Sequence, residues 1–178
     1  MKTIIVSNRK GGVGKTTVAT HLAAGMSLLG LRVGVVDTDP QGHAASAFGL
    51  PKHNGLYNLI TDRNAQYKDN LMQVPPESYA VPGWDAPTPM VLLPSDIKTA
   101  RILTTEGVKV WTFRRKVREF ATRYKLEYVI VDTSPSNTIF DDSLSLAADY
   151  YLYVTEAAAL SFDGLEEALD ELDQTNDG

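Results

Sequence analysis

Short apolar runs alternate along this chain with longer segments in which apolar residues recur at helical spacing. The runs are continuous or nearly so, which is typical of strands buried on both faces of a sheet. We expect strands at residues 3–6, 32–36, 90–93, 128–131 and 150–154. A helical pattern covers residues 17–29, and an amphipathic stripe consists of Val110, Phe113, Val117, Phe120 and Tyr124. The alternation predicts an α/β fold, a mainly parallel sheet with helices on both faces.

The segment between the second and third predicted strands breaks this alternation. Six of the nine prolines lie between Pro75 and Pro94, and residues 51–89 show little periodicity. This composition predicts an extended surface excursion and not a separate domain. We therefore expect a single domain over residues 1–178 with a Pro-rich excursion at residues 51–89. Beyond the third strand, Ser95 is expected to cap a short helix that begins near Asp96.

A glycine-rich segment joins the first predicted strand to the first predicted helix. Between them the chain reads Lys10, Gly11, Gly12, Val13, Gly14, Lys15, Thr16 and Thr17. Glycines let backbone N–H groups approach an anion without a clash, and the positive end of the helix dipole favours that anion. Lys15 can reach the outer phosphates of a nucleotide, and the Thr16 hydroxyl can ligate Mg²⁺. The segment predicts a phosphate-binding loop, and the plainer alternative is an ordinary glycine turn.

Acidic residues follow two other strands at the carboxyl edge of the predicted sheet, where the active sites of parallel sheets lie. Asp132 follows the strand at residues 128–131, and we expect it to hold Mg²⁺ through water. Asp37 and Asp39 lie just beyond the second strand, and a carboxylate near a γ-phosphate can orient the attacking water. The plainer interpretation of Asp132 is a helix cap or loop aspartate, and that of the residues around Asp39 is a turn.

The composition restricts the chemistry that the chain can perform. With 178 residues, of which 43% are hydrophobic and 22% charged, it has the make-up of an ordinary globular protein. It contains no cysteine, which excludes disulfides, cysteine-bound zinc and iron–sulfur clusters. No apolar run is long enough to span a bilayer, and the N-terminus enters a strand at once. We therefore expect no signal peptide and a cytoplasmic protein.

The formal net charge of −5 is distributed unevenly. All 17 Lys and Arg residues lie at or before Lys125, so residues 1–125 carry +8, whereas residues 126–178 carry −13. Any surface for a polyanion is therefore expected in the first part. Within the basic stretch at residues 109–125, we expect Arg114, Arg115 and Arg118 to be the DNA contacts if the chain binds DNA. A solvated basic helix face is the plainer interpretation.

Taken together, the motifs resemble those of the ParA/MinD family of P-loop ATPases, and of its ParA/Soj-like DNA partition members in particular. The resemblance rests on K-G-G-V-G-K-T-T at residues 10–17, D-T-D-P-Q-G at residues 37–42, L-L-P-S at residues 92–95 and V-D-T-S-P-S at residues 131–136. It continues through residues 154–156 and a helix near Gly164, and ends at about Leu169.

One feature departs from the general P-loop pattern, and two others depart from the family pattern. Arg9 stands where the general P-loop pattern has glycine, and Ser134 replaces the first proline of the second switch motif. Relatives commonly continue for several more strands and helices, which contribute an adenine-contacting strand and much of the DNA-binding surface. Here the sequence ends after a predicted acidic helix at residues 162–172.

The resemblance implies a Mg²⁺-dependent ATPase that forms a homodimer when it binds ATP. Lys10 matches the family's signature lysine, which reaches the partner's nucleotide across the dimer. Asp39 matches the water-orienting position, and Asp37 lies closer to the metal. The resemblance also implies partition or positioning of plasmid or chromosomal DNA, nonspecific DNA binding at the nucleoid, and hydrolysis stimulated by a ParB-like partner. The C-terminal part is acidic, so we expect no membrane anchor.

Two other functions are compatible with the same motifs. One is an ATP-dependent small-molecule ligase on this scaffold, similar to dethiobiotin synthetase. It needs a substrate pocket and does not require Lys10 to cross a dimer. The other is a positioning ATPase for a non-DNA cargo, or a nucleotide-gated adaptor that does not hydrolyse ATP. Steady-state turnover with and without DNA separates these classes.

Overall fold

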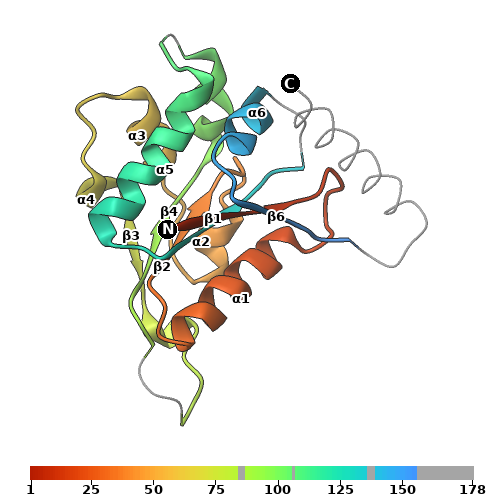
Figure 1. Cartoon of the computed structure of the whole chain (residues 1–178), viewed down its shortest axis with the longest axis vertical. Coiled ribbons are helices and arrows are strands. Elements are labelled where there is room, and N and C mark those ends of the chain that lie inside the picture. Colours follow the sequence, from red (N-terminus) through yellow and green to blue (C-terminus); the bar gives the residue numbers. More distant parts are fainter. Residues whose placement is uncertain (84–86, 106, 136–138, 156–178) are drawn as a thin grey trace.

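The computed structural model describes residues 1–83, 87–105, 107–135 and 139–155 (Figure 1). These residues form a six-stranded sheet in the order β3-β4-β2-β5-β1-β6. The strands are β1 (Lys2–Ser7), β2 (Val33–Asp37), β3 (Met72–Val74), β4 (Met90–Leu93), β5 (Tyr128–Asp132) and β6 (Tyr150–Tyr153). All neighbouring pairs are parallel except β3 with β4. The predicted mainly parallel sheet is confirmed.

Helices cover both faces of this sheet (Figure 1). One face carries α1 (Lys15–Leu28) and α2 (His43–Ala47). The opposite face carries α3 (Gly55–Thr61), α4 (Tyr67–Asn70), α5 (Val110–Tyr124) and α6 (Ile139–Ser145). Two 3₁₀ segments, η1 (Pro76–Ser78) and η2 (Ile97–Thr104), complete the described secondary structure. No helix in the described part of the chain is both long and apolar enough to cross a membrane.

Neighbouring residues of each central strand contribute to two different cores. Ile5 and Val36 belong to the core beneath α5, whereas Val6 and Val35 belong to the core beneath α1. Successive side chains of a strand point to opposite faces of the sheet, so a strand covered on both sides needs apolar residues at every position. This requirement explains why the strands read as continuous apolar runs in the sequence.

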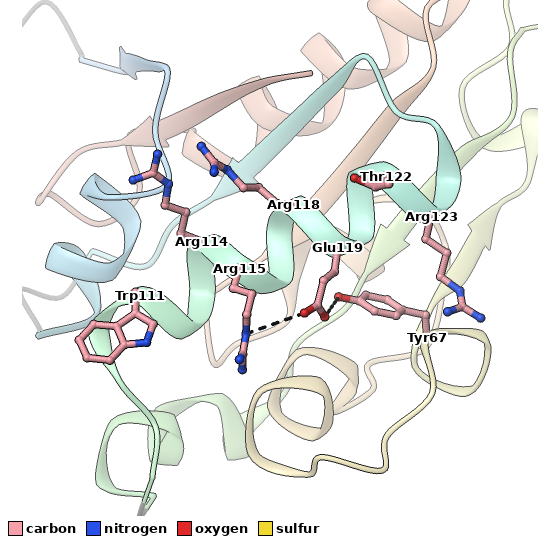
Figure 2. Close-up of a pocket in the computed structure, with 8 residues that line it drawn as sticks. All are labelled: Tyr67, Trp111, Arg114, Arg115, Arg118, Glu119, Thr122 and Arg123. Carbon is pink, nitrogen blue, oxygen red and sulfur yellow. Dashed lines mark hydrogen bonds and ion pairs between the residues drawn. The ribbon is translucent and has the colours of Figure 1, made fainter.

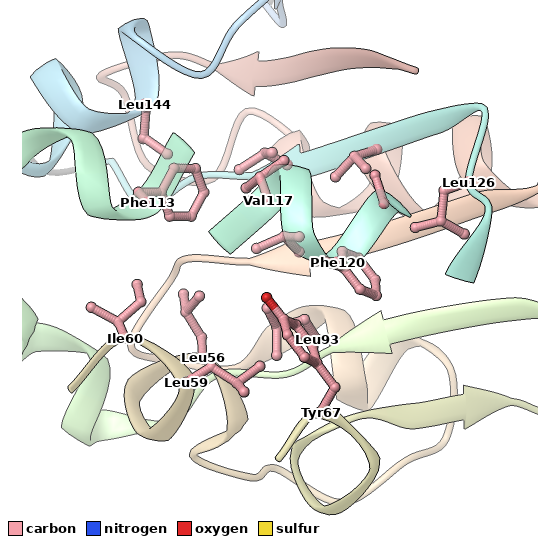
Figure 3. Packing of buried hydrophobic residues seen from close by; sticks show 14 of the residues in the cluster. Leu56, Leu59, Ile60, Tyr67, Leu93, Phe113, Val117, Phe120, Leu126 and Leu144 are labelled. Carbon is pink, nitrogen blue, oxygen red and sulfur yellow. The ribbon is translucent and has the colours of Figure 1, made fainter. Parts of the chain in front are cut away.

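The amphipathic stripe of α5 contributes three of its five residues to the buried core on this face of the sheet (Figure 3). Phe113, Val117 and Phe120 lie on its buried side, and their side chains face the sheet and the α3–α4 region. Gly34 on β2 makes room for them, because a Cβ atom there would lie 2.5 Å from a Leu126 methyl and 2.7 Å from the Phe120 ring. The glycine in this strand is therefore a packing requirement between β2 and α5.

The segment at residues 51–89 differs from the predicted surface excursion. It contains α3, α4, β3 and η1, and Leu56, Leu59 and Tyr67 are buried in the core beneath α5. These elements are only three to seven residues long, which is too short for a helical or strand periodicity to stand out against the prolines. The prediction of a surface segment failed for residues 55–74, because tertiary packing, and not local pattern, stabilises such short elements.

Ser95 also differs from its predicted place. The residue that caps the following 3₁₀ helix is Asp96, whose carboxylate accepts a hydrogen bond from the Lys98 N–H (2.9 Å). Ser95 is buried, and its hydroxyl donates to the Asp39 carbonyl. Ser95 therefore supports the loop that carries Asp39. The predicted helix at residues 162–172 and the ends of two motifs, Ser136 and Glu156, lie outside the described residues.

Candidate active site

The glycine-rich segment forms the turn between the end of β1 and the first residue of α1. Gly12 and Gly14 have φ angles of 80° and 91°, in the left-handed region that a side chain disfavours. The N-cap residue of α1 is Gly14, which has no side chain to offer the first N–H groups, and the first turn of the helix contains no acidic residue. The first N–H groups of a helix lack intrahelical partners and carry the positive end of the dipole. This helix end is therefore suited to an anion.

Lys15 begins α1 and is unusually buried for a lysine, with 6% of its surface exposed. Its ammonium donates a hydrogen bond to the Lys10 carbonyl (3.0 Å). Burial lowers its pKa, and the charges of Asp132 and Asp39 act in the opposite direction. The cation is thus held inside the loop, close enough to Asp132 and Asp39, two of the three acids that the sequence singled out, to interact with their charges. Lys10 itself has an exposed side chain.

Asp132 ends β5 in the middle of the sheet and is fully buried. Within the described part of the chain, neither of its carboxylate oxygens has a hydrogen-bond partner. Burial raises its pKa to about 7; the charge of Asp37 adds to this rise, and the nearby Thr16 hydroxyl and Lys15 ammonium oppose it. A buried carboxylate without partners is costly, and a bound cation is the usual remedy. Asp132 and Thr16 together therefore fit a divalent cation.

Asp37 has a different environment, although it is equally buried. One of its oxygens accepts from the Asp39 N–H (2.9 Å) and the other from the Ala44 N–H in the first turn of α2 (3.1 Å). Burial raises the pKa of Asp37 to about 6, and these two hydrogen bonds partly offset the rise. Asp37 thus supports the loop that leads into α2, and its predicted place near a metal stays a prediction.

Asp39 lies on that loop and is nearly buried. Its carboxylate accepts from the Gln41 N–H (2.8 Å), and its carbonyl accepts the Ser95 hydroxyl. Thr38, the preceding residue, donates both its hydroxyl and its N–H to the Asp132 carbonyl (2.8 and 2.9 Å). The loop is therefore attached to β5 on one side and, through Ser95, to the segment just beyond β4 on the other. Sequence reasoning had assigned no role to Thr38.

The sequence-predicted residues fall into two groups in space. The phosphate loop, Thr16, Asp39 and Asp132 meet at the carboxyl ends of β1, β2 and β5. Among the described residues, no three His, Asp or Glu side chains are close enough to enclose a metal ion by themselves. Mg²⁺ is commonly bound by one or two protein oxygens together with phosphate oxygens of the substrate. The site therefore fits a metal that arrives with a phosphate-bearing ligand.

The predicted DNA contacts belong to a separate surface on the outer side of α5 (Figure 2). There a groove of about 890 Å³ is lined by Tyr67, Trp111, Arg114, Arg115, Arg118, Glu119, Thr122 and Arg123. Trp111 is 61% exposed, which the sequence analysis did not anticipate. Glu119, the acidic residue among those that line the groove, forms ion pairs with Arg115 (3.8 Å) and Lys116 (3.1 Å). Arg114 and Arg118 have no acidic partner among the described residues.

Comparison with known proteins identifies the family to which the chain belongs. A family profile described as an AAA domain matches residues 1–177. The chromosome partitioning protein ParA of Myxococcus xanthus is 31% identical over 182 residues, which cover 98% of this chain and 59% of that protein. The chain spans about three fifths of the length of such curated relatives.

Solved structures share the fold. An ATP complex of a Cyanothece McdA variant superposes with a TM-score of 0.80 at 22% identity, covering 99% of this chain and 65% of that one. Cobyrinic acid a,c-diamide synthase of Mycobacterium smegmatis, with ADP and magnesium bound, gives the same TM-score and identity, covering 99% of this chain and 69% of that one. At this identity the likeness shows the fold alone. The profile match and the ParA-like relatives show that the chain belongs to the AAA-domain family of P-loop ATPases, as a protein of the ParA type.

Proposed function

We propose that this chain binds ATP with Mg²⁺, dimerises in the ATP-bound state and hydrolyses ATP to drive the partition or positioning of DNA. The observation that carries the proposal is the fully buried Asp132 carboxylate, which has no hydrogen-bond partner in the described part and lies near Thr16 and Lys15. A carboxylate in this state is suited to a cation, and the adjacent open helix end is suited to phosphate.

Each residue of the site then has a distinct task. The loop amides from Gly11 to Thr17 and the Lys15 ammonium bind the phosphates. Thr16 and Asp132 hold Mg²⁺, Asp132 through water, and the metal neutralises charge that develops on the phosphate oxygens. Asp39 orients the water that attacks the γ-phosphorus, while Asp37 fixes the loop that places Asp39. ADP and phosphate are the products.

Lys10 acts on the second nucleotide of the dimer in this proposal. Its peptide group faces into the loop, where its carbonyl accepts from Lys15, and its side chain is exposed. A side chain that leaves the surface here can reach a phosphate bound by a second copy. Because only the triphosphate offers a γ-phosphate to such a lysine, ATP and not ADP would favour the dimer.

DNA is the proposed matrix, and the exposed arginines Arg114, Arg115 and Arg118 of α5 are the proposed contacts (Figure 2). Cations on one helix face bind the phosphate backbone without reading sequence, by displacing counterions. A ParB-like protein would stimulate hydrolysis and release the dimer from the nucleoid. The similarity to a chromosome partitioning protein supports this part of the proposal.

A small-molecule ligase is the second candidate, because the superposition on a cobyrinic acid a,c-diamide synthase is as good as that on McdA. Such an enzyme would use the same phosphate loop to activate a carboxylate. Its turnover would depend on a small carboxylic acid and an amine source. Positioning of a cargo other than DNA is a third possibility that keeps the ATP-dependent dimer.

Two measurements test the proposal. Steady-state release of phosphate is measured with Mg²⁺-ATP alone, with nonspecific double-stranded DNA, and with cobyrinic acid and glutamine. Sedimentation velocity is run with ADP, ATP and a nonhydrolysable ATP analogue. We expect slow turnover that responds to DNA, and a larger species with the triphosphates only. Fast turnover that ignores DNA but requires the acid and amine would support the ligase instead.

A further inference from the structure

Asn8 is a buried polar residue at the start of the phosphate loop that the proposed function leaves without a task. It follows the last residue of β1, and 6% of its surface is exposed. Its side-chain amide nitrogen donates to the carbonyl of Val154, just beyond β6 (2.7 Å). Its side-chain oxygen accepts from the N–H of Lys10 (2.7 Å). One side chain thus joins the end of β6 to the first residue of the glycine-rich segment.

The Lys10 peptide group continues this connection to the phosphate-binding lysine. Its N–H is held by Asn8, and its carbonyl accepts the Lys15 ammonium at 3.0 Å. The orientation of the Lys10 backbone therefore determines where an acceptor is presented to Lys15. It also determines the direction in which the Lys10 side chain leaves the loop.

We propose that Asn8 is a positioning residue for nucleotide binding: it acts through the Lys10 backbone on Lys15 and on the loop amides. This inference rests on the proposed ATP binding. The chemistry of the two partners explains the residue type, because a carbonyl requires a donor and an N–H requires an acceptor, and a carboxamide supplies both. An aspartate lacks the donor, and it would add a negative charge beside a site for phosphate.

The connection acts on affinity through preorganisation. A glycine-rich loop has many accessible backbone conformations, and ordering them on binding opposes affinity. A buried side chain with two short hydrogen bonds holds one conformation before the nucleotide arrives. Without the acceptor at position 8, the Lys10 N–H is no longer held before the nucleotide binds. The loop must then become ordered during binding, and this ordering lowers the affinity. We expect this loss in nucleotide affinity more than in the rate of the bound complex.

The test compares Asn8→Ala, Asn8→Ser and a matched control, Asn70→Ala. Asn70 is also buried, and its side chain also donates to a carbonyl (Gln66, 2.8 Å) and accepts a hydrogen bond (Asn58, 2.8 Å). It lies on α4, away from the loop. A serine hydroxyl at position 8 can still accept from the N–H two residues on, but it is too short to replace the bond to Val154. Affinities for a fluorescent ATP analogue and for ADP are measured with thermal midpoints and with kcat and KM.

We expect Asn8→Ala to weaken ATP binding at least ~10-fold, and to raise KM more than it lowers kcat. Asn8→Ser should bind within about threefold of the parent. Asn70→Ala should lower the thermal midpoint by a few degrees and leave affinity unchanged. Parent-like ATP affinity in Asn8→Ala, or a loss in Asn8→Ser as large as in Asn8→Ala, overturns the inference. A parent chain that binds no nucleotide overturns the proposed function, and this inference with it.

Discussion

Asp37 and Asp132 are register partners on the neighbouring parallel strands β2 and β5, and both are fully buried. Asp37 has two backbone N–H donors, whereas Asp132 has no hydrogen-bond partner within the described part. The charge of Asp37 contributes to the raised pKa of Asp132. Two acids therefore lie side by side in the site. A bound cation would stabilise the ionised form of Asp132 more than that of Asp37, because Asp37 already accepts two hydrogen bonds.

The first prediction follows from this pair and concerns pH. The folded-state pKa values of about 6 for Asp37 and about 7 for Asp132 lie above the ordinary value of 3.8. These two carboxyl groups therefore bind more protons in the folded than in the unfolded chain between pH 4 and pH 7, and their contribution to the free energy of unfolding falls as pH rises through this window. We expect Asp132→Asn to be more stable than the parent at pH 7.5 by about 2–4 kcal/mol.

Urea titrations of the parent and Asp132→Asn at several pH values, without nucleotide, measure this difference. The stabilisation should shrink towards pH 4 and vanish at about pH 3 and below, where Asp132 is protonated in both the folded and the unfolded chain. A difference that stays constant from pH 4 to pH 7.5 would show that the Asp132 charge is not its source. Asp132→Asn should at the same time bind ATP without the usual Mg²⁺ dependence.

The second prediction concerns Lys15. We expect Lys15→Ala to lose measurable ATP binding, because it removes the main cation on the outer phosphates. The fold should be kept, since the lysine is the first residue of α1 and its ammonium donates to a loop carbonyl, that of Lys10. Isothermal titration with Mg²⁺-ATP, with circular dichroism as the control for folding, measures both. Normal affinity in a folded Lys15→Ala chain would contradict the phosphate-loop assignment.

The third prediction separates Lys10 from Lys15. Because the Lys10 side chain is exposed and its backbone makes the contacts to Asn8 and Lys15, Lys10→Ala should still bind ATP within a few-fold of the parent. It should not form the ATP-dependent dimer, and its turnover should fall. Sedimentation velocity with ATP and ADP measures the dimer directly. A Lys10→Ala chain that dimerises and turns over as the parent does would exclude the role across the dimer.

The fourth prediction concerns Asp39. Asp39→Ala should bind Mg²⁺-ATP as the parent does and turn over at least ~100-fold more slowly, because water orientation is lost only in the transition state. The variant should accumulate as the ATP-bound dimer. Single-turnover kinetics with a filter-binding measurement of ATP separate the two effects. Equal losses in binding and turnover would indicate that Asp39 serves the nucleotide and not the water.

The sequence predicted the parts of this fold that depend on local pattern. Five strands and the α5 stripe could be identified because strands covered on both faces are apolar throughout and long helices show their period. The phosphate loop and Asp132 could be placed because each adjoins such an element. Topology then brings them together, since the carboxyl ends of parallel strands share one edge of the sheet.

What the sequence did not reveal depends on contacts between distant residues. Asn8 contacts Val154 across 146 positions, and Ser95 contacts Asp39 across 56. Asn8 belongs to no local pattern, and the local pattern around Ser95 predicted a helix cap and not this contact. The short helices α3 and α4 are stabilised by burial of Leu56, Leu59 and Tyr67 against α5, which only the assembled fold provides. The bonding of Asp37 to the first turn of α2 was hidden for the same reason.

The last prediction concerns the arginines of α5. If the exposed arginines of α5 bind DNA, the double variant Arg114→Ala/Arg118→Ala should weaken nonspecific binding. A plot of the logarithm of the binding constant against the logarithm of the salt concentration should become less steep by up to about two units. Lys2→Ala/Arg32→Ala is the matched control. It removes the same charge from exposed side chains that pair with Asp149 and Glu127 and lie at the start of β1 and just before β2.

Fluorescence anisotropy of a labelled duplex at several salt concentrations, with ATP and Mg²⁺ present, measures both variants. The control should keep nearly the parent slope, because contact with phosphate and not net charge sets the number of counterions released. Trp111→Ala should change affinity little on duplex DNA, since its ring stacks well only on unpaired bases. If both double variants weaken binding equally, the effect is one of net charge, and α5 is a solvated basic helix face.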